Sequence, residues 1–375
     1  MTGLARYITD RGLLAGMERV ARTAADCGWL AALAEELLDL LYGDGGEPQF
    51  WALYTRCRAE LEQALREDAD CYLAYVYGLG FPRLAAIYRR HGYPRQVLAD
   101  TLSDFDLRAK NYRDQHGGRA GIDDYRWLTR HMTATVFRLG RLQFVFSKPF
   151  VYGTRIFRNL RDGSLTAVAE GGLAVDGQGF AAAEGEFVTE LEESTELAES
   201  VEAVVDGTVT ANLIGPDGSI LDRKVRLPAG EYVCVIRNGE PVIDIHIPAD
   251  GSRMSPQDAA LSLRMAWAFA QRYFPEIPFR GFVCSSWLLS TEVEEILPED
   301  ANLVRFSRLF TRCAGQKRQH ELIYSWIFGM DKKKQDFRLH EPSTTLQKGA
   351  RRLLEEGRWF TSRNGFIPAE RFTNC

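Results

Sequence analysis

The sequence predicts an α+β protein, with an all-helical N-terminal domain followed by a domain with a mixed β-sheet and flanking helices. Three patterns indicate this. Apolar residues recur at helical spacing as far as about residue 138, alternate between Arg141 and Pro248, and after that change between helix and strand patterns. A length of 375 residues favours two domains, which we expect at residues 1–138 and 139–375.

The N-terminal part consists of amphipathic segments separated by short polar breaks. Leucines recur every three or four residues, as on one helix face, at Leu30, Leu33, Leu37, Leu38 and Leu41. The glycines from Gly43 onward end that segment, and FWALYTRCRAELEQAL and YRWLTRHMTATVFRLG repeat the pattern. Glycine-containing breaks such as GLGFP and HGGRAG separate the segments. We therefore expect a helical domain.

The middle of the chain has the pattern of β-hairpins. Val, Ile, Phe and Thr alternate with polar residues from Arg141 to Pro248. Asp-Gly or Asn-Gly pairs, which accept the positive φ of tight turns, stand at 162–163, 176–177, 206–207, 217–218 and 238–239. The prediction is an antiparallel meander whose last strand is 241–247.

After this strand, helices and strands alternate. The patterns predict a long helix, a strand at 279–288, a short helix near 291–297, a strand around 320–328 and a final helix at about 344–356.

Composition excludes several classes of protein. The net charge is −5 with mixed signs, whereas a nucleic-acid-binding protein usually has a basic excess. No long apolar run predicts a membrane span, and MTGLARYITDRGLL lacks the apolar core of a secretory signal. The seven cysteines form no CxxC pair and the six histidines are dispersed, so neither a disulfide framework nor a metal site is expected. A cytoplasmic location fits these features.

The most informative segment is the strand PVIDIHI. Because side chains alternate along a strand, Asp244 and His246 lie on one face and Ile243, Ile245 and Ile247 on the other. An imidazole beside a carboxylate can act as a general base near neutral pH. The alternative is a strand with one solvated face.

A helix start follows this strand. Ser255 suits the N-cap, Pro256 the first helical position and Asp258 completes a capping box. Further along, Leu261, Met265 and Phe269 step along one face and predict a contribution to the core.

The loop before that helix holds Gly251, Ser252 and Arg253. Its backbone N–H groups and the positive helix end suit a pyrophosphate, although Asp250 adds a negative charge. The alternative is an ordinary capped helix.

A second candidate segment is GFVCSSWLLSTEVEEI. A strand ends in Cys284, Ser285 and Ser286, beside Trp287, which places a hydroxyl or thiol where a thioester could bind. The alternative for Cys284 is a small buried apolar residue. No GxSxG surrounds these serines, so a hydrolase nucleophile elbow is not indicated.

Four pieces of sequence resemble the N-acyltransferase family: FRLGRLQF (137–144), IDIHIPADG (243–251), FVCSSWLL (282–289) and NLVRFSRLF (302–310). The resemblance implies a GNAT-like fold for the C-terminal domain and acyl-CoA as the donor. It places the pantetheine arm along the strand at 244–248 and the pyrophosphate at 249–255. This loop has a single glycine, Gly251, and the helix after Trp287 lacks the tyrosine acid common in GNAT enzymes.

The leading hypothesis is an N-acyltransferase in which a small-molecule amine attacks the thioester directly. His246, assisted by Asp244, would take the amine proton, and Ser285 or Ser286 would protonate the departing thiolate. The residues expected to bind coenzyme A are Ile245, Ile247, Gly251, Ser252, Arg253, Ser255 and Trp287. Two alternatives remain: a non-catalytic acyl-CoA-binding or interaction protein on the same scaffold, and a purely structural protein.

Overall fold

The computed structural model describes residues 3–181, 198–248, 250–251, 254–315, 321–328 and 340–373. The chain forms two compact units, and each is described by itself. The first contains Met1–Val145 and Ile247–Ser252, and the second contains Phe146–His246 and Arg253–Cys375. In the described parts of both units, every helix is too short or too polar to cross a lipid bilayer.

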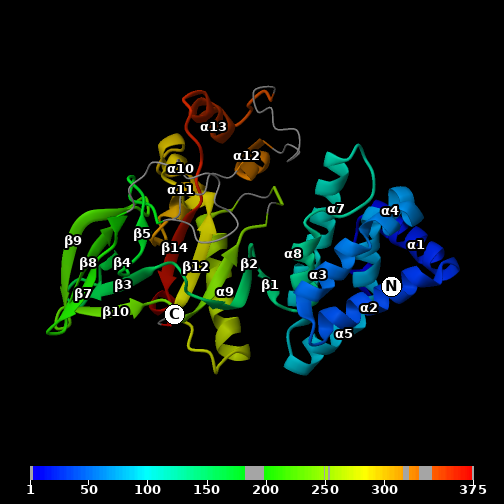
Figure 1. Ribbon diagram of the computed structural model, residues 1–375, viewed down its shortest axis with the longest axis horizontal. Coiled ribbons are helices and arrows are strands. Elements are labelled where there is room, and N and C mark those ends of the chain that lie inside the picture. The colour runs from blue at the N-terminus through cyan, green and yellow to red at the C-terminus, as the bar shows by residue number, and fades with distance from the viewer. Residues whose placement is uncertain are drawn as a thin grey trace. The chain divides into compact units, whose positions relative to one another are not determined.

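The first unit is built from helices, as expected (Figure 1). Its elements are the 3₁₀ turns η1 (Leu4–Arg6) and η2 (Arg66–Cys71) and the helices α1 (Arg11–Asp26), α2 (Gly28–Tyr42), α3 (Gly46–Arg56), α4 (Arg58–Leu65), α5 (Tyr72–His91), α6 (Arg95–Leu102), α7 (Asp104–Gln115) and α8 (Tyr125–Met132). The predicted leucine stripe of α2 is buried along its whole length. The hairpin of β1 (Val136–Leu139) and the first half of β2 (Leu142–Pro149) completes this unit.

A buried polar cluster joins α7, α8 and β2 inside the first unit. The side chains of Asp104 and His131 are fully buried, with Oδ2 of Asp104 3.4 Å from Nε2 of His131. The ring Nδ1 of His131 lies 2.9 Å from the Trp127 carbonyl oxygen, and its Nε2 lies 3.2 Å from the amide nitrogen of Gln143. Burial lowers the pKa of His131, although the Asp104 carboxylate opposes that shift. His131 is therefore a neutral packing residue at neutral pH.

A mixed sheet has the strand order β1-β2-β11-β12-β14-β13, and its strands from the second half of β2 onward belong to the second unit. Its further strands are β11 (Pro241–His246), β12 (Gly281–Ser286), β13 (Thr311–Arg312) and β14 (Arg363–Pro368). Strands β11 and β12 run parallel, whereas β12 pairs antiparallel with β14 along its whole length. The mixed sheet confirms the predicted fold class.

A second, antiparallel sheet has the order β10-β3-β4-β8-β7, with β9 also paired to β8. Its strands are β3 (Thr154–Asn159), β4 (Leu165–Ala169), β7 (Glu202–Val205), β8 (Thr208–Ile214), β9 (Ile220–Pro228) and β10 (Tyr232–Ile236), and the short strands β5 (Ala174–Val175) and β6 (Ala198–Glu199) pair with each other. The predicted single meander from 141 to 248 is therefore wrong, because its first and last strands belong to the mixed sheet. Strand alternation predicts strands but not which of two sheets they join.

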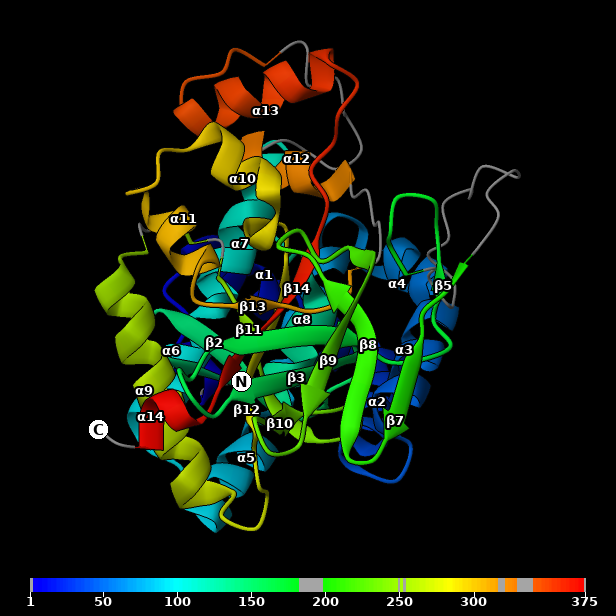
Figure 2. The same cartoon turned by 90° about the vertical axis from the view of Figure 1, so that its left-hand side faces the viewer.

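The two sheets of the second unit pack face to face around one apolar core (Figure 2). Ile156, Ala167 and Ile214 of the antiparallel sheet meet Val283 and Phe366 of the mixed sheet in this core. The Asp-Gly turn at 206–207 joins β7 to β8, and both of its residues have positive φ, as a type I′ turn requires.

The helix α9 (Pro256–Tyr273) begins as predicted. Ser255 accepts a hydrogen bond from the backbone N–H of Asp258, whose side chain completes the capping box. The predicted core stripe is wrong at Leu261 and Met265, which are exposed. The helix buries a face of mostly smaller residues instead, at Ala259, Ser262, Leu263, Ala266, Phe269 and Ala270.

Four helices form a group at one end of the second unit (Figure 1). They are α10 (Thr291–Ile296), α11 (Asn302–Ser307), α12 (Glu321–Phe328) and α13 (Thr345–Glu355); the 3₁₀ turn η3 (Trp287–Leu289) precedes them and α14 (Glu370–Thr373) follows β14. The predicted strand at 320–328 is wrong, because α12 is a helix. It buries Ile323, Tyr324, Ile327 and Phe328, a helical spacing that a short apolar run does not reveal.

Candidate active site

The parallel strands β11 and β12 separate near their ends, where the sequence predicted Asp244 and His246 on one strand and Ser285 on the other. Their pairing joins Ile243 to Phe282 and Asp244 to Val283, and among the described residues it ends there. Strand β12 continues in register with β14 as far as Ser286, which pairs with Arg363. The end of β11 and the end of β12 therefore diverge, with His246 on one strand and Ser285 on the other.

Asp244 and His246 are in contact, as their shared strand face predicts. Nε2 of His246 lies 3.2 Å from Oδ2 of Asp244, and the histidine is half-buried while the carboxylate is almost fully buried. Lys148 of β2, which no sequence pattern marked, donates from its Nζ to the same Oδ2 atom at 2.9 Å. One carboxylate oxygen thus serves both an imidazole and an ammonium group.

The charges of this group stabilise one another. Burial opposes ionisation of Asp244, but its contacts with His246 and Lys148 outweigh burial and lower its pKa. Burial likewise disfavours the charged form of Lys148, and the Asp244 carboxylate outweighs that and raises the lysine pKa. Asp244 is therefore an anion and Lys148 a cation at neutral pH.

A second missed residue, Tyr152, continues the contacts toward β12. Nζ of Lys148 lies 3.4 Å from the Tyr152 hydroxyl, and that hydroxyl lies 3.2 Å from Oγ of Ser285. Burial raises the pKa of Tyr152 to about 12, although the Lys148 charge opposes the shift. Tyr152 is therefore a protonated hydrogen-bond donor throughout the neutral range.

The hydrogen bonds from Lys148 onward run in one direction. Ser285 donates to Oδ1 of Asn364 at 2.6 Å, and the amide nitrogen of Asn364 donates to the Ala314 carbonyl at 3.1 Å. Because the single hydroxyl proton of Ser285 goes to Asn364, the Tyr152 hydroxyl is the donor to Ser285. We call the series of Lys148, Tyr152, Ser285 and Asn364 the polar chain. No sequence pattern marked Lys148 and Tyr152, because they approach β11 and β12 only through folding.

The other residues predicted on β12 have packing roles. Cys284 is fully buried and burial raises its pKa, in agreement with the small apolar alternative. The Ser286 hydroxyl accepts a hydrogen bond from the Leu288 N–H and caps the turn η3. Trp287 is half-buried, with its ring 5.8 Å from that of Phe360 at a steep angle.

The segment after β11 was predicted to hold coenzyme A. Ile245 is buried and Ile247 half-buried, while Ser252 and Arg253 lie outside the described residues. Gly251 has a φ of +73° with open space where a Cβ would stand, and the Ser255 hydroxyl is engaged in the capping box. The phosphate-binding role of these residues stays a prediction.

Within the first unit, Asp250 forms ion pairs with two arginines of the β1–β2 hairpin. Its Oδ2 lies 2.7 Å from Arg138 and its Oδ1 lies 3.1 Å from Arg141, which also donates to the Pro248 carbonyl at 3.2 Å. The two arginines thus neutralise the negative charge of Asp250, which by itself would disfavour a pyrophosphate in this segment.

Acidic, histidine and cysteine side chains meet in pairs, such as Asp244 with His246, in the part of the chain that the structure describes. No group of three or more of them is gathered there in a way that could hold a metal ion.

A mixed sheet with two parting parallel strands, preceded in the sequence by a helical region, defines a GNAT-like acyltransferase. The model of the GNAT-like C-terminal domain matches residues 136–367, and that of the N-acyltransferase N-terminal domain matches residues 18–134. The chain therefore belongs to the N-acyltransferase family with a GNAT-like C-terminal domain. No curated protein matches the sequence.

Solved structures of acyltransferases share the fold. One is an acyltransferase in complex with decanoyl-CoA and teicoplanin, with 18% identity, a TM-score of 0.55, and coverage of 90% of this chain and 76% of that chain. Another, in complex with decanoyl-CoA, has 20% identity, a TM-score of 0.54, and coverage of 87% and 80%. A mutant acyltransferase in complex with octanoyl-CoA has 19% identity, a TM-score of 0.52, and coverage of 80% and 67%.

Proposed function

We propose that this acyltransferase moves an acyl group from acyl-CoA to an amine by direct attack at the point where β11 and β12 separate. The observation that supports this most is the contact of His246 with Asp244 on the last residues of β11. A base at that point lies on the strand along which the resemblance places the pantetheine arm, whose end carries the thioester.

His246 acts as the general base. The amine nitrogen attacks the thioester carbonyl carbon, and the imidazole takes the proton that the new bond makes acidic. Asp244 orients the ring, and Lys148 donates a hydrogen bond to the same carboxylate oxygen. Backbone N–H groups at the end of β11 stabilise the oxyanion of the tetrahedral intermediate. Collapse of this intermediate breaks the carbon–sulfur bond and releases the amide.

The leaving thiolate needs a hydrogen-bond donor more than an acid. A thiol has a pKa of about 8.5, far below the Tyr152 pKa of about 12, so full proton transfer from Tyr152 to the thiolate is unfavourable. We propose that the Tyr152 hydroxyl donates a hydrogen bond to the sulfur, and that Ser285 positions this hydroxyl between turnovers. The proton held by His246 then passes to the thiolate or to solvent.

Coenzyme A binds through the segment after β11 in this proposal. Gly251 lets the backbone approach the phosphates, and Ser252, Arg253 and the N-terminus of α9 after Ser255 supply donors. The ion pairs of Asp250 with Arg138 and Arg141 support the assignment, because they remove the repulsion that a lone carboxylate would exert on a phosphate.

The acceptor is proposed to be an amine. Two of the solved acyltransferases of this fold hold teicoplanin or 10C-teicoplanin together with a CoA species. We therefore propose an amine carried by a glycopeptide or a similar large acceptor, with an amino sugar and a small amine as the simpler candidates.

The test is a turnover assay that follows release of free coenzyme A thiol. Acetyl-, octanoyl- and decanoyl-CoA are each offered with a simple amine, an amino sugar, a peptide and teicoplanin. We expect acceptor-dependent thiol release and an amide product by mass spectrometry. A thermal shift with acyl-CoA but no product with any acceptor would replace the proposal by the acyl-CoA-binding alternative. The absence of both signals would favour the structural alternative.

A further inference from the structure

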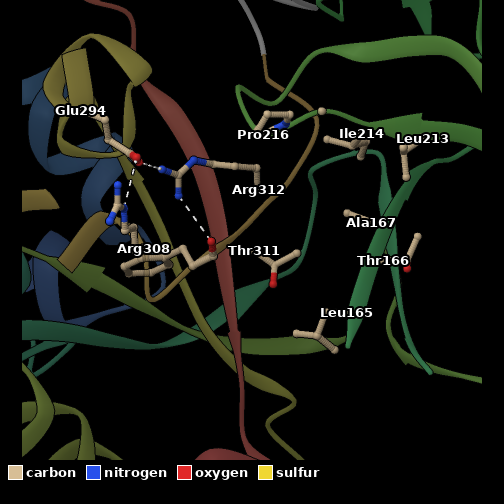
Figure 3. A pocket seen from close by; sticks show the side chains of 12 residues that line it. Leu165, Thr166, Ala167, Leu213, Ile214, Pro216, Glu294, Arg308, Thr311 and Arg312 are labelled. Atoms are coloured by element: carbon tan, nitrogen blue, oxygen red, sulfur yellow. Dashed lines mark hydrogen bonds and ion pairs between the residues drawn. The ribbon is translucent and has the colours of Figure 1, made fainter. Parts of the chain in front are cut away.

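A pocket of about 380 Å³ lies in the second unit and shares no residue with the polar chain or with the Asp244–His246 pair. Strand β4 and the end of β8 form one wall, and residues of α10 and of the segment before and within β13 form the other (Figure 3). A volume of this size holds a small organic molecule.

The two walls differ in chemistry. The wall from the antiparallel sheet is mainly apolar, with Ala167, Leu213 and Ile214 among its residues. In Figure 3 the side chains of Arg308 and Arg312 point toward Glu294, on the opposite side of the pocket from Leu213 and Ile214. A ligand here meets a hydrocarbon surface on one side and charges on the other.

Arg312 is a buried cation with unused hydrogen-bonding capacity. It is only 8% exposed, and its two terminal nitrogens donate to the Ser307 carbonyl at 2.9 Å and the Ser307 hydroxyl at 2.6 Å. Its Nε–H has no partner among the described residues. An unpaired donor on a buried cation is costly, so such a group favours an added acceptor.

The pocket carries more positive than negative charge. Among the described residues of the lining, Glu294 is the one carboxylate, and its oxygens lie 3.4 Å from both Arg308 and Arg312. That distance is at the outer limit of a hydrogen bond, whereas Arg280 and Glu240 in the same unit approach to 2.6 Å. Two guanidinium groups thus share one loosely bound carboxylate.

A second carboxylate near the pocket does not change this balance. Arg308 also reaches Glu299 at 3.4 Å, but Glu299 lies outside the lining and its side chain is 87% exposed. Water and salt therefore screen its charge.

We propose that this pocket is a second ligand site, for a small carboxylate with an apolar body. The carboxylate would bind between Arg308 and Arg312, whose planar N–H groups match two oxygens of one carboxylate. The apolar body would lie against Leu213, Ile214 and Ala167. The proposal is independent of the acyl-transfer chemistry, because none of its residues takes part in that chemistry.

The test is isothermal titration of the full chain with sodium octanoate, with 1-octanol as the uncharged ligand of the same length. We expect saturable octanoate binding, and octanol binding that is weaker by about tenfold or more. Arg308→Gln, a partly exposed position, should weaken octanoate about tenfold, the loss expected for one charge-assisted hydrogen bond.

Two further variants test whether octanoate binds in this pocket. Thr166→Phe, which fills the pocket from β4, should also weaken octanoate binding. Arg280→Gln removes the same charge elsewhere in the unit and should leave the affinity within about twofold of the wild type.

Three results would overturn the proposal. One is the absence of octanoate binding, and another is equal affinity for octanol. The third is equal octanoate affinity in the Arg308→Gln and Arg280→Gln variants, which would place any bound octanoate in another part of the chain. Because Arg308 is partly exposed, this comparison decides the matter even if Thr166→Phe is poorly folded.

Discussion

The ammonium nitrogen of Lys148 lies 2.9 Å from the carboxylate oxygen of Asp244 that also contacts His246. Lys148 therefore has two roles in this group, one electrostatic and one structural. It neutralises a buried carboxylate that the imidazole alone would neutralise only when protonated, and it connects that carboxylate to Tyr152. The Lys148 cation thus helps to keep Asp244 ionised in its buried position.

The first prediction concerns His246. The variant His246→Ala should lower kcat by about 10²–10⁴-fold, because it removes a general base, and should leave the KM for acyl-CoA nearly unchanged. Steady-state kinetics measures both constants. The control is His91→Ala, an exposed histidine of α5. A loss of less than about tenfold for His246→Ala would mean that the base is elsewhere or that the amine arrives deprotonated.

The second prediction concerns the Tyr152 hydroxyl. Tyr152→Phe should lower kcat about tenfold, because one hydrogen bond to a developing anion is lost, while the KM for acyl-CoA changes little. The matched control is Tyr232→Phe on β10, whose hydroxyl accepts from the Asn159 amide at 3.3 Å. If both variants keep the wild-type kcat, Tyr152 serves only to hold β2 and β12 together.

The third prediction separates phosphate binding from backbone strain at Gly251. Gly251→Val should weaken coenzyme A binding, since a side chain at this position prevents close approach of the backbone to phosphate. Gly163, in the turn between β3 and β4, has the same φ of +73° and the same open surroundings, so Gly163→Val reproduces the strain without the site. Titration calorimetry with coenzyme A compares the two. Equal affinity in both variants would contradict the loop assignment.

The fourth prediction is a pH dependence of stability from His131. Burial lowers its pKa in the folded protein below the ordinary value of 6.5. His131 therefore binds a proton near pH 6.5 in the unfolded chain, but only at lower pH in the folded chain. Because protonation then favours the unfolded state, the free energy of unfolding falls as the pH drops below about 6.5. The slope reaches at most about 1.4 kcal/mol per pH unit for one proton.

Urea unfolding followed by circular dichroism at about pH 7.5, 6.5 and 5.5, on either side of the ordinary histidine pKa, measures this slope. The groups around His131 include Asp104, Arg108 and Asp124, and their charges are common to the wild type and the variant. His131→Gln should therefore lose the slope contributed by one proton, whereas His91→Gln at an exposed position should keep it. An unchanged slope in His131→Gln would show that the folded protein also protonates this histidine.

Local patterns predicted the parts of the fold that depend on local chemistry. The capping box at Ser255, the buried leucine stripe of α2 and the tight turn at Asp206 and Gly207 are set by neighbouring residues, and all three are present. The prediction for α12 failed because a short run of mostly apolar residues fits a strand as well as a helix. The exposed Leu261 and Met265 show that large apolar side chains do not mark the buried face of a helix when small ones permit closer packing.

The candidate site was predictable only within one strand. Asp244 and His246 are two residues apart, so the alternation of side chains was enough to place them together. Lys148 is 96 residues from Asp244, and Asn364 is 79 residues from Ser285; only the strand order of the mixed sheet brings them to one place. No spacing in the sequence encodes such an approach.

The direction of the hydrogen bonds in the polar chain determines which hydrogen-bonding capacity of the Ser285 hydroxyl stays available to a bound molecule. A serine hydroxyl has one proton and two lone pairs; here the proton goes to Asn364 and one lone pair receives the Tyr152 hydroxyl. The Asn364 amide cannot turn round without giving up its own bond to Ala314. The exposed side of Ser285 therefore offers a single lone pair, so it attracts an N–H group and repels a carbonyl oxygen.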